Sequence, residues 1–164
     1  MSTRILLIIV LSLLPTSALA QDLFEEIPKL QDRMEGLDVQ IHASQGRLLA
    51  SATLNARQND TFVLLSGTRN GLLMINREFQ ALYKYKFLAS LITEQLATKY
   101  AMRTVVLQRD YLKKISKGQI EWVEKSLHTA ADQETTRLLL EARDLFRSSL
   151  ELLDRLQVPE PAAK

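Results

Sequence analysis

The chain has 164 residues with 21 basic and 19 acidic side chains, and its net charge of +2 indicates no particular class of partner. It contains no cysteine, which excludes disulfides, thiolate metal sites and a thiol nucleophile. Five glycines and four prolines are too few for a loop-rich or all-β protein, and this composition is typical of a helical one.

Residues 1–20 have the three parts of a secretory signal peptide. Arg4 supplies a basic start, residues 5–14 are an apolar run, and residues 18–20 form a small-residue cleavage site. The apolar run is well short of the roughly 20 residues needed to cross a bilayer. We therefore expect an exported protein with no transmembrane span in its mature chain. It would be periplasmic in a Gram-negative bacterium and otherwise secreted.

The mature chain is predicted to form one helical domain over residues 21–157. Its length fits a single domain of ordinary size. Residues 158–164 contain two prolines and are expected to form a disordered tail.

Apolar residues at the start of the domain recur at alternating spacings of four and three, the pattern of one helix face. They are Leu23, Ile27, Leu30, Met34, Leu37 and Ile41, and Leu48 continues the register. Pro28 falls early in this pattern, so we expect regular helix from about Pro28, with the preceding turn kinked or separate. A polar run near Asn59 predicts the following turn, with Asp60 as the N-cap of the next helix.

Gly67 and Gly71 lie between two apolar runs. If the chain turns back near Asn59, Gly67 faces about Ala52 and Gly71 faces about Leu48. Each glycine costs a helix roughly 1 kcal/mol relative to alanine. Close approach of a face of small residues would offset that cost, so we predict a tight helix–helix contact here.

The same stretch has an alternative interpretation as a β-hairpin. Residues 61–66 and 72–76 would be its strands, joined by a glycine-containing loop. Neither run alternates polar and apolar residues, and helical patterns lie on both sides. The helical interpretation is therefore preferred.

A helical pattern continues from Leu72 without glycine or proline until Gly118. One helix of that length is far above the usual 10–14 residues, so it either breaks or stays extended with thin ends that favour self-association. Three lysines before Gly118 predict a helix end there. Residues 129–132 offer a second start for the last helix. The sequence predicts an all-α fold, an elongated, coiled-coil-like antiparallel bundle of three or four long amphipathic helices.

Basic residues are concentrated in residues 84–117, whereas residues 21–60 and 121–160 are acidic overall. This basic ridge suggests an anionic partner such as a glycan, a phospholipid headgroup or an acidic protein. The alternative is that the acidic flanking helices neutralise the ridge within the chain. Export and the balanced net charge argue against nucleic acid. The ridge residues are Lys99, Arg103, Arg109, Lys113 and Lys117.

Two histidines each follow a carboxylate by four residues. Asp38 with His42, and Glu124 with His128, would make a divalent metal site if the two pairs met. The spacing differs from the Glu-x-x-His pattern of di-iron bundles. We therefore expect no metal and no cofactor, and a metal-dependent enzyme is the third-ranked hypothesis.

No nucleophile elbow, phosphate-binding glycine loop or His-Glu-x-x-His motif occurs in the chain. The preferred hypothesis is therefore a non-enzymatic protein that acts by protein–protein association or self-association. The alternative is a small-ligand sensor or carrier that binds a molecule in the bundle core. That site would lie near Phe79, Tyr83 and Phe87, which share a helix face and are otherwise expected to pack in the core.

Overall fold

The computed structural model describes residues 18–50, 53–91 and 95–156, and describes side chains over residues 25–50, 53–84 and 103–156. Most of the predicted signal peptide and the predicted tail lie outside these residues. The described elements are α2 (Ala18–Leu49), α3 (Ala56–Leu91), α4 (Gln95–Leu127) and α5 (Gln133–Arg155). Every regular element described is a helix, which confirms the all-α prediction. The β-hairpin alternative is wrong, because both of its strands fall inside α3.

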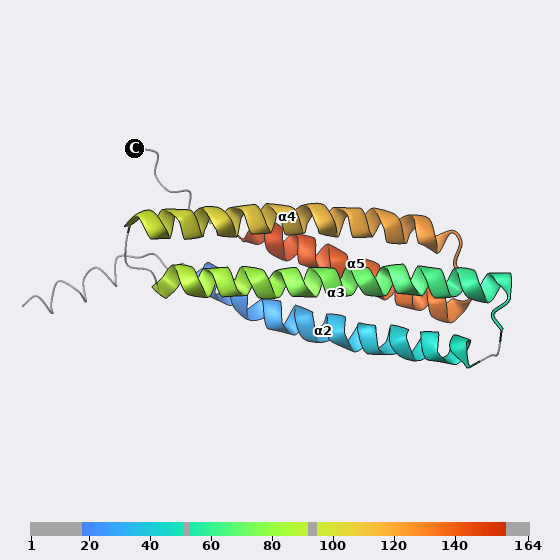
Figure 1. Cartoon of the computed structure of the whole chain (residues 1–164). Coiled ribbons are helices and arrows are strands. Elements are labelled where there is room, and N and C mark those ends of the chain that lie inside the picture. Colours follow the sequence, from blue (N-terminus) through green and yellow to red (C-terminus); the bar gives the residue numbers. More distant parts are fainter. Residues whose placement is uncertain (1–17, 51–52, 92–94, 157–164) are drawn as a thin grey trace, which may run out of the picture.

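The four helices form an elongated bundle in which each helix runs antiparallel to the next (Figure 1). α3 packs against α2 and α4, and α5 packs against α4 and α2. α3 and α5 also touch across the centre, whereas α2 and α4 make no contact over their described residues. None of the helices in the described ranges is long and apolar enough to cross a membrane.

The core draws on the apolar stripe of every helix. The predicted face of α2 is confirmed, since its members from Ile27 to Ile41 are at most 5% exposed. Burying a side chain of this size contributes roughly 1.5–3 kcal/mol. The largest fully buried side chains are Phe79, Phe146, Ile27, Met34, Leu37, Ile41, Leu65, Leu72, Ile75, Leu82, Leu112 and Leu138.

The turn between α2 and α3 comes earlier than the sequence predicted. α3 begins at Ala56, so Asp60 lies inside a helix and caps nothing. The cap is a reciprocal pair instead, in which the Gln58 amide N–H donates to Asn55 Oδ1 (2.9 Å) and the Asn55 amide N–H donates to Gln58 Oε1 (3.0 Å). Such a capping box satisfies two backbone donors at once and outcompetes a single aspartate. Pro28 lies inside α2 and does not start it.

The long pattern from Leu72 breaks into α3 and α4, but the predicted helix end at Gly118 is wrong. α4 continues through Gly118 to Leu127. A glycine C-cap needs a positive φ, and no glycine in the described ranges has one. Burial explains the continuation, since Ser116 and Val123 are both fully buried on either side of Gly118. The alternative start in residues 129–132 is confirmed, because Asp132 caps α5 by accepting from the Thr135 amide N–H at 2.7 Å.

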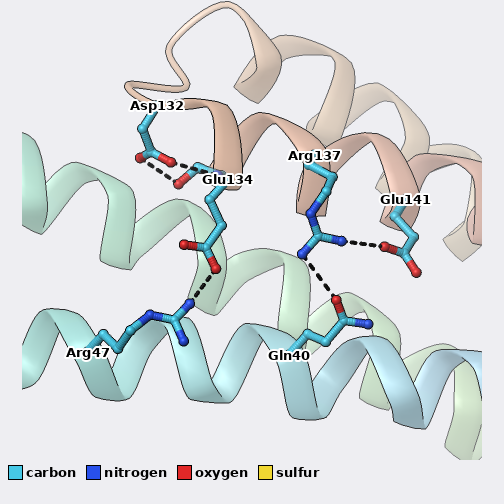
Figure 2. Close-up of polar contacts among 7 residues, drawn as sticks. Gln40, Arg47, Asp132, Glu134, Arg137 and Glu141 are labelled. Carbon is cyan, nitrogen blue, oxygen red and sulfur yellow. Dashed lines mark hydrogen bonds and ion pairs between the residues drawn. The ribbon is translucent and has the colours of Figure 1, made fainter.

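Polar contacts join α2 to α5 along the outside of the bundle (Figure 2). Arg47 pairs with Glu134, and Arg137 donates to Gln40 and to Glu141, each at 3.1 Å. These groups are exposed, so each pair contributes at most about 1 kcal/mol. The set aligns the two helices more than it stabilises them.

The other end of the α2–α5 seam is held by Arg155, which donates to Glu26 at 2.5 Å. This hydrogen bond is the main reason that the pKa of Arg155 is raised above its ordinary value. The arginine is charged throughout the physiological pH range in either case, so the contact carries no pH switch.

Candidate functional site

Gly67 and Gly71 both lie under bulky side chains from α4. A Cβ added at Gly67 would come within 2.5 Å of Trp122 Cζ2, and one added at Gly71 within 2.7 Å of Gln119 Cδ. The Phe146 ring of α5 lies 3.2 Å from the same position at Gly71. The two glycines therefore allow α3 and α4 to approach closely, and they accommodate large side chains, not small ones.

The predicted partners of the two glycines were on α2, but their nearest neighbours are on α4 and α5. The face of α3 that holds both glycines points to α4 and α5, and the early turn in addition changes which level of α2 lies beside α3. Arg69 Nε donates to Asp38 at 2.7 Å, whereas a turn near Asn59 would place Arg69 opposite Ala50. This moves the pairing by more than three helical turns along α2. Leu48 is thus nowhere near the level of Gly71, and Ala52 lies outside the described residues.

Buried polar side chains from α3, α4 and α5 lie in the interior of the bundle. Ser116 is fully buried, and its Oγ has no hydrogen-bond partner among the described groups. The same holds for Gln119 Oε1, one turn further along α4. Thr68 and Ser149 are also fully buried, and each satisfies its hydroxyl by donating to the carbonyl four residues earlier.

The structure places the described side chains of the predicted basic ridge on two different flanks of α4. Arg109 and Lys113 point toward α5, where Arg109 donates to the Leu156 carbonyl at 3.2 Å and Lys113 pairs with Asp154 at 2.7 Å. Arg103 and Lys117 are exposed and form no ion pair with a described residue. The Lys99 side chain lies outside the described side chains. Neutralisation within the chain therefore applies to one flank of the ridge, and the other flank faces outward.

Two further cations, Lys114 and Lys125, are exposed on the outward flank and were not among the ridge residues named from the sequence. Leu107 and Tyr111 lie on the same face and are 60% and 50% exposed. The sequence signal for this face is its spacing, since positions 103, 107, 114, 117 and 121 recur every three or four residues, apart from one interval of seven. This spacing identifies an exposed face only after the structure shows which face of α4 is buried.

The two histidine pairs do not assemble into a metal site. Asp38 lies on α2 and Glu124 on α4, two helices that make no contact over their described residues. Each carboxylate already binds an arginine, Arg69 for Asp38 and Arg147 for Glu124, both at 2.7 Å. No group of three or more histidine, aspartate or glutamate side chains within the described part of the chain is placed to hold a metal ion.

Two of the three aromatic residues proposed to line a ligand site, Phe79 and Tyr83, differ in burial. Phe79 is fully buried, whereas Tyr83 is 50% exposed and the Phe87 side chain lies outside the described ones. The buried position after Phe79 is Leu82, three residues on, so the core-facing stripe moves away from Tyr83. A groove of about 460 Å³ lies elsewhere, on the surface beside Trp122. Its lining residues are Phe62, Val63, Ser66, Gly67, Gln119 and Trp122.

Comparison of the chain with protein-family models, with curated proteins and with solved structures gives no match. The functional argument therefore depends on the surfaces and contacts described above.

Proposed function

We propose that this protein is an exported, non-enzymatic helical bundle that acts by associating with another protein or with itself. The observation that carries this proposal is that large apolar side chains lie next to one another on the outside of the bundle. Val39 is 66% exposed and Leu107 is 60% exposed. A single exposed apolar side chain is ordinary, whereas adjacent ones typically mark sites of contact with other macromolecules. Val39 lines one surface pocket together with Leu73, and Leu107 lies one turn from Tyr111 on α4. The others in the described residues are Leu49, Val63, Leu73, Tyr83, Tyr111 and Leu140.

The stability of the bundle does not depend on these exposed side chains. The interior is filled by side chains from all four helices, and Phe79 and Phe146 are fully buried within it. Truncating the outer residues would therefore alter association and leave folding almost unchanged. This separation makes the proposal testable by mutation.

A small-ligand carrier is the second candidate. It is favoured by the unpartnered Gln119 Oε1 and by the groove beside Trp122, to which Gln119 also contributes. A bound molecule with a donor group would satisfy that oxygen, since buried polar atoms are normally hydrogen-bonded. This candidate predicts a small molecule on the purified protein.

Native mass spectrometry of the chain, purified gently from the cells that make it, separates the two candidates. The association proposal predicts masses at whole multiples of the chain, or at the chain plus a second protein. A single chain carrying an extra mass of small-molecule size would contradict it and support the carrier. A single bare chain at every concentration would contradict both candidates.

A further inference from the structure

The outer face of α4 combines exposed apolar side chains with several exposed cations. Leu107 and Tyr111 lie one turn apart near one end of it, with more than half of the leucine and half of the tyrosine exposed. The remaining exposed side chains of this face are charged, and they are Arg103, Asp110, Lys114, Lys117, Glu121 and Lys125. This face therefore has two exposed apolar side chains with charged side chains around them.

Most of the charged side chains on this face are positive and make no ion pair within the described residues. Arg103, Lys114, Lys117 and Lys125 make no ion pair within the part of the chain that the structure describes. Of the two acids, Asp110 is already bound by Arg109 at 2.9 Å, which leaves only Glu121 to offset four cations. Unpaired surface cations attract carboxylates and raise the rate of encounter with an acidic surface.

The arginines of α5 show that this arrangement is not general in the fold. Arg137, Arg143, Arg147 and Arg155 each bind a carboxylate, on α5 itself or on a neighbouring helix. The bundle thus neutralises these arginines on α5 and leaves four cations on the outer face of α4 unpaired among the described residues. A positive face that is retained beside exposed apolar groups fits a partner with the opposite charge and an apolar stripe.

We infer that the outer face of α4 docks an acidic amphipathic helix of another protein, in which apolar side chains meet Leu107 and Tyr111 and flanking carboxylates meet the lysines. This inference rests on the proposed function and names the partner chemistry of that association. From Arg103 to Lys125 the face is about 33 Å long at 1.5 Å per residue, enough for about six turns of a partner helix. Recognition of this kind uses apolar anchors at helical spacing, with charge setting the register.

A second copy of the chain fits this face less well. The carboxylates of α2 and α5 that make no ion pair among the described residues are Glu25, Asp32, Glu35 and Glu151. Lys29 and Arg33 offset two of them, and Glu35 already accepts a hydrogen bond from Asn76 Nδ2 at 3.2 Å. Neither helix therefore offers the acidic surface that the α4 face requires. A complex with a different protein is the better match.

A membrane surface and nucleic acid fit less well too. A helix that lies in a bilayer interface presents a broad apolar face to the lipid, whereas the broad apolar face of α4 is buried in the bundle core. Nucleic acid would engage the cations mainly through phosphates and would leave Leu107 and Tyr111 without apolar contacts.

The probe for the test is a fluorescent 21-residue peptide that repeats leucines at helical heptad spacing with flanking glutamates, and its binding to the full chain is followed by fluorescence anisotropy. We expect the double variant Lys114→Glu/Lys117→Glu to weaken binding at least tenfold. Leu107→Ala/Tyr111→Ala should cause a similar loss. Far-UV circular dichroism should confirm that both variants remain folded, since all four residues are exposed.

The matched control is Lys29→Glu/Arg33→Glu, which removes two exposed, unpaired cations from α2 and changes the net charge of the chain equally. It should weaken binding less than threefold. Equal losses for the α2 and α4 variants would overturn the inference, because net charge alone would then explain binding. Equal affinity for a peptide with glutamines in place of the glutamates would overturn it as well.

Two further outcomes identify a different partner. Tighter, α4-dependent binding to phosphatidylglycerol vesicles than to the peptide would replace the helix by a lipid surface and overturn the inference. If native mass spectrometry shows a protein complex that survives both α4 double variants, the association proposal stands and the α4 assignment alone fails.

Discussion

Replacing Gly67 with leucine is expected to destabilise the bundle by about 3 kcal/mol or more. The new Cβ would lie 2.5 Å from Trp122 Cζ2 and 2.6 Å from Trp122 Cη2, distances that real side chains do not adopt. The indole is a rigid ring, so it would have to leave its place between α3 and α4. Urea unfolding measures the loss, and the only tryptophan in the chain reports it directly through its fluorescence.

Gly118 provides the matched control for this prediction. It lies in the middle of α4, and a Cβ added there meets nothing within 4 Å. Gly118→Ala should therefore leave packing intact and raise the free energy of unfolding by up to about 1 kcal/mol, through helix propensity. Similar behaviour of Gly67→Leu and Gly118→Ala would show that Trp122 does not pack on Gly67.

Replacing Phe79 with alanine is expected to lower the free energy of unfolding by about 3–5 kcal/mol. The ring is fully buried among the apolar stripes, so truncation removes buried apolar surface and leaves a cavity. Thermal or urea unfolding monitored by far-UV circular dichroism measures the change. Retention of the wild-type midpoint would mean that Phe79 is not in the core.

Tyr83 is the matched comparison, because it is also aromatic and lies only one turn further along α3. Half of its surface is exposed, so Tyr83→Ala should cost much less, about 1 kcal/mol. The contrast tests the face assignment along α3, since the sequence pattern placed both rings in the core. A larger loss at Tyr83 than at Phe79 would reverse that assignment.

The fold class followed from the sequence because helical periodicity is a local property. The stripe from Ile27 to Ile41 predicted a buried face, and those side chains are buried. Residues 129–132 predicted a start for the last helix, and α5 begins directly after Asp132, which caps it. Each of these inferences needed only residues within a few positions of one another.

The pairing between helices did not follow, because it depends on where each turn falls. Asp60 and the Asn55–Gln58 pair are both good cap signals, and only the second is used. Moving the turn by a few residues shifts facing positions by twice as much, so the predicted level of the α2–α3 pairing was wrong. Which helix Gly67 faces is set by the packing of α3 between α2 and α4, and its neighbour is Trp122 of α4. Gly118 failed as a stop for a related reason, since burial on both sides of it outweighs its low helix propensity.

The outward face of α4 shows the same limit for the candidate site. The sequence identified a cluster of cations but not which of them the fold neutralises. Lys113 meets Asp154 of α5, whereas Lys114, the next residue, faces outward. That distinction is set by the packing of α4 against α5 and is absent from the local pattern.

Site-specific photocrosslinking in the cells that make the protein tests most directly whether the bundle works through its exterior. Benzoylphenylalanine would replace Leu107 on α4 in one variant and Val39 on α2 in another, both of them exposed positions. The account predicts a protein adduct from position 107 that is stronger than any from position 39 and that disappears with Lys114→Glu/Lys117→Glu. Its crosslinked peptide should be acidic and amphipathic. No protein adduct at either position would contradict the account.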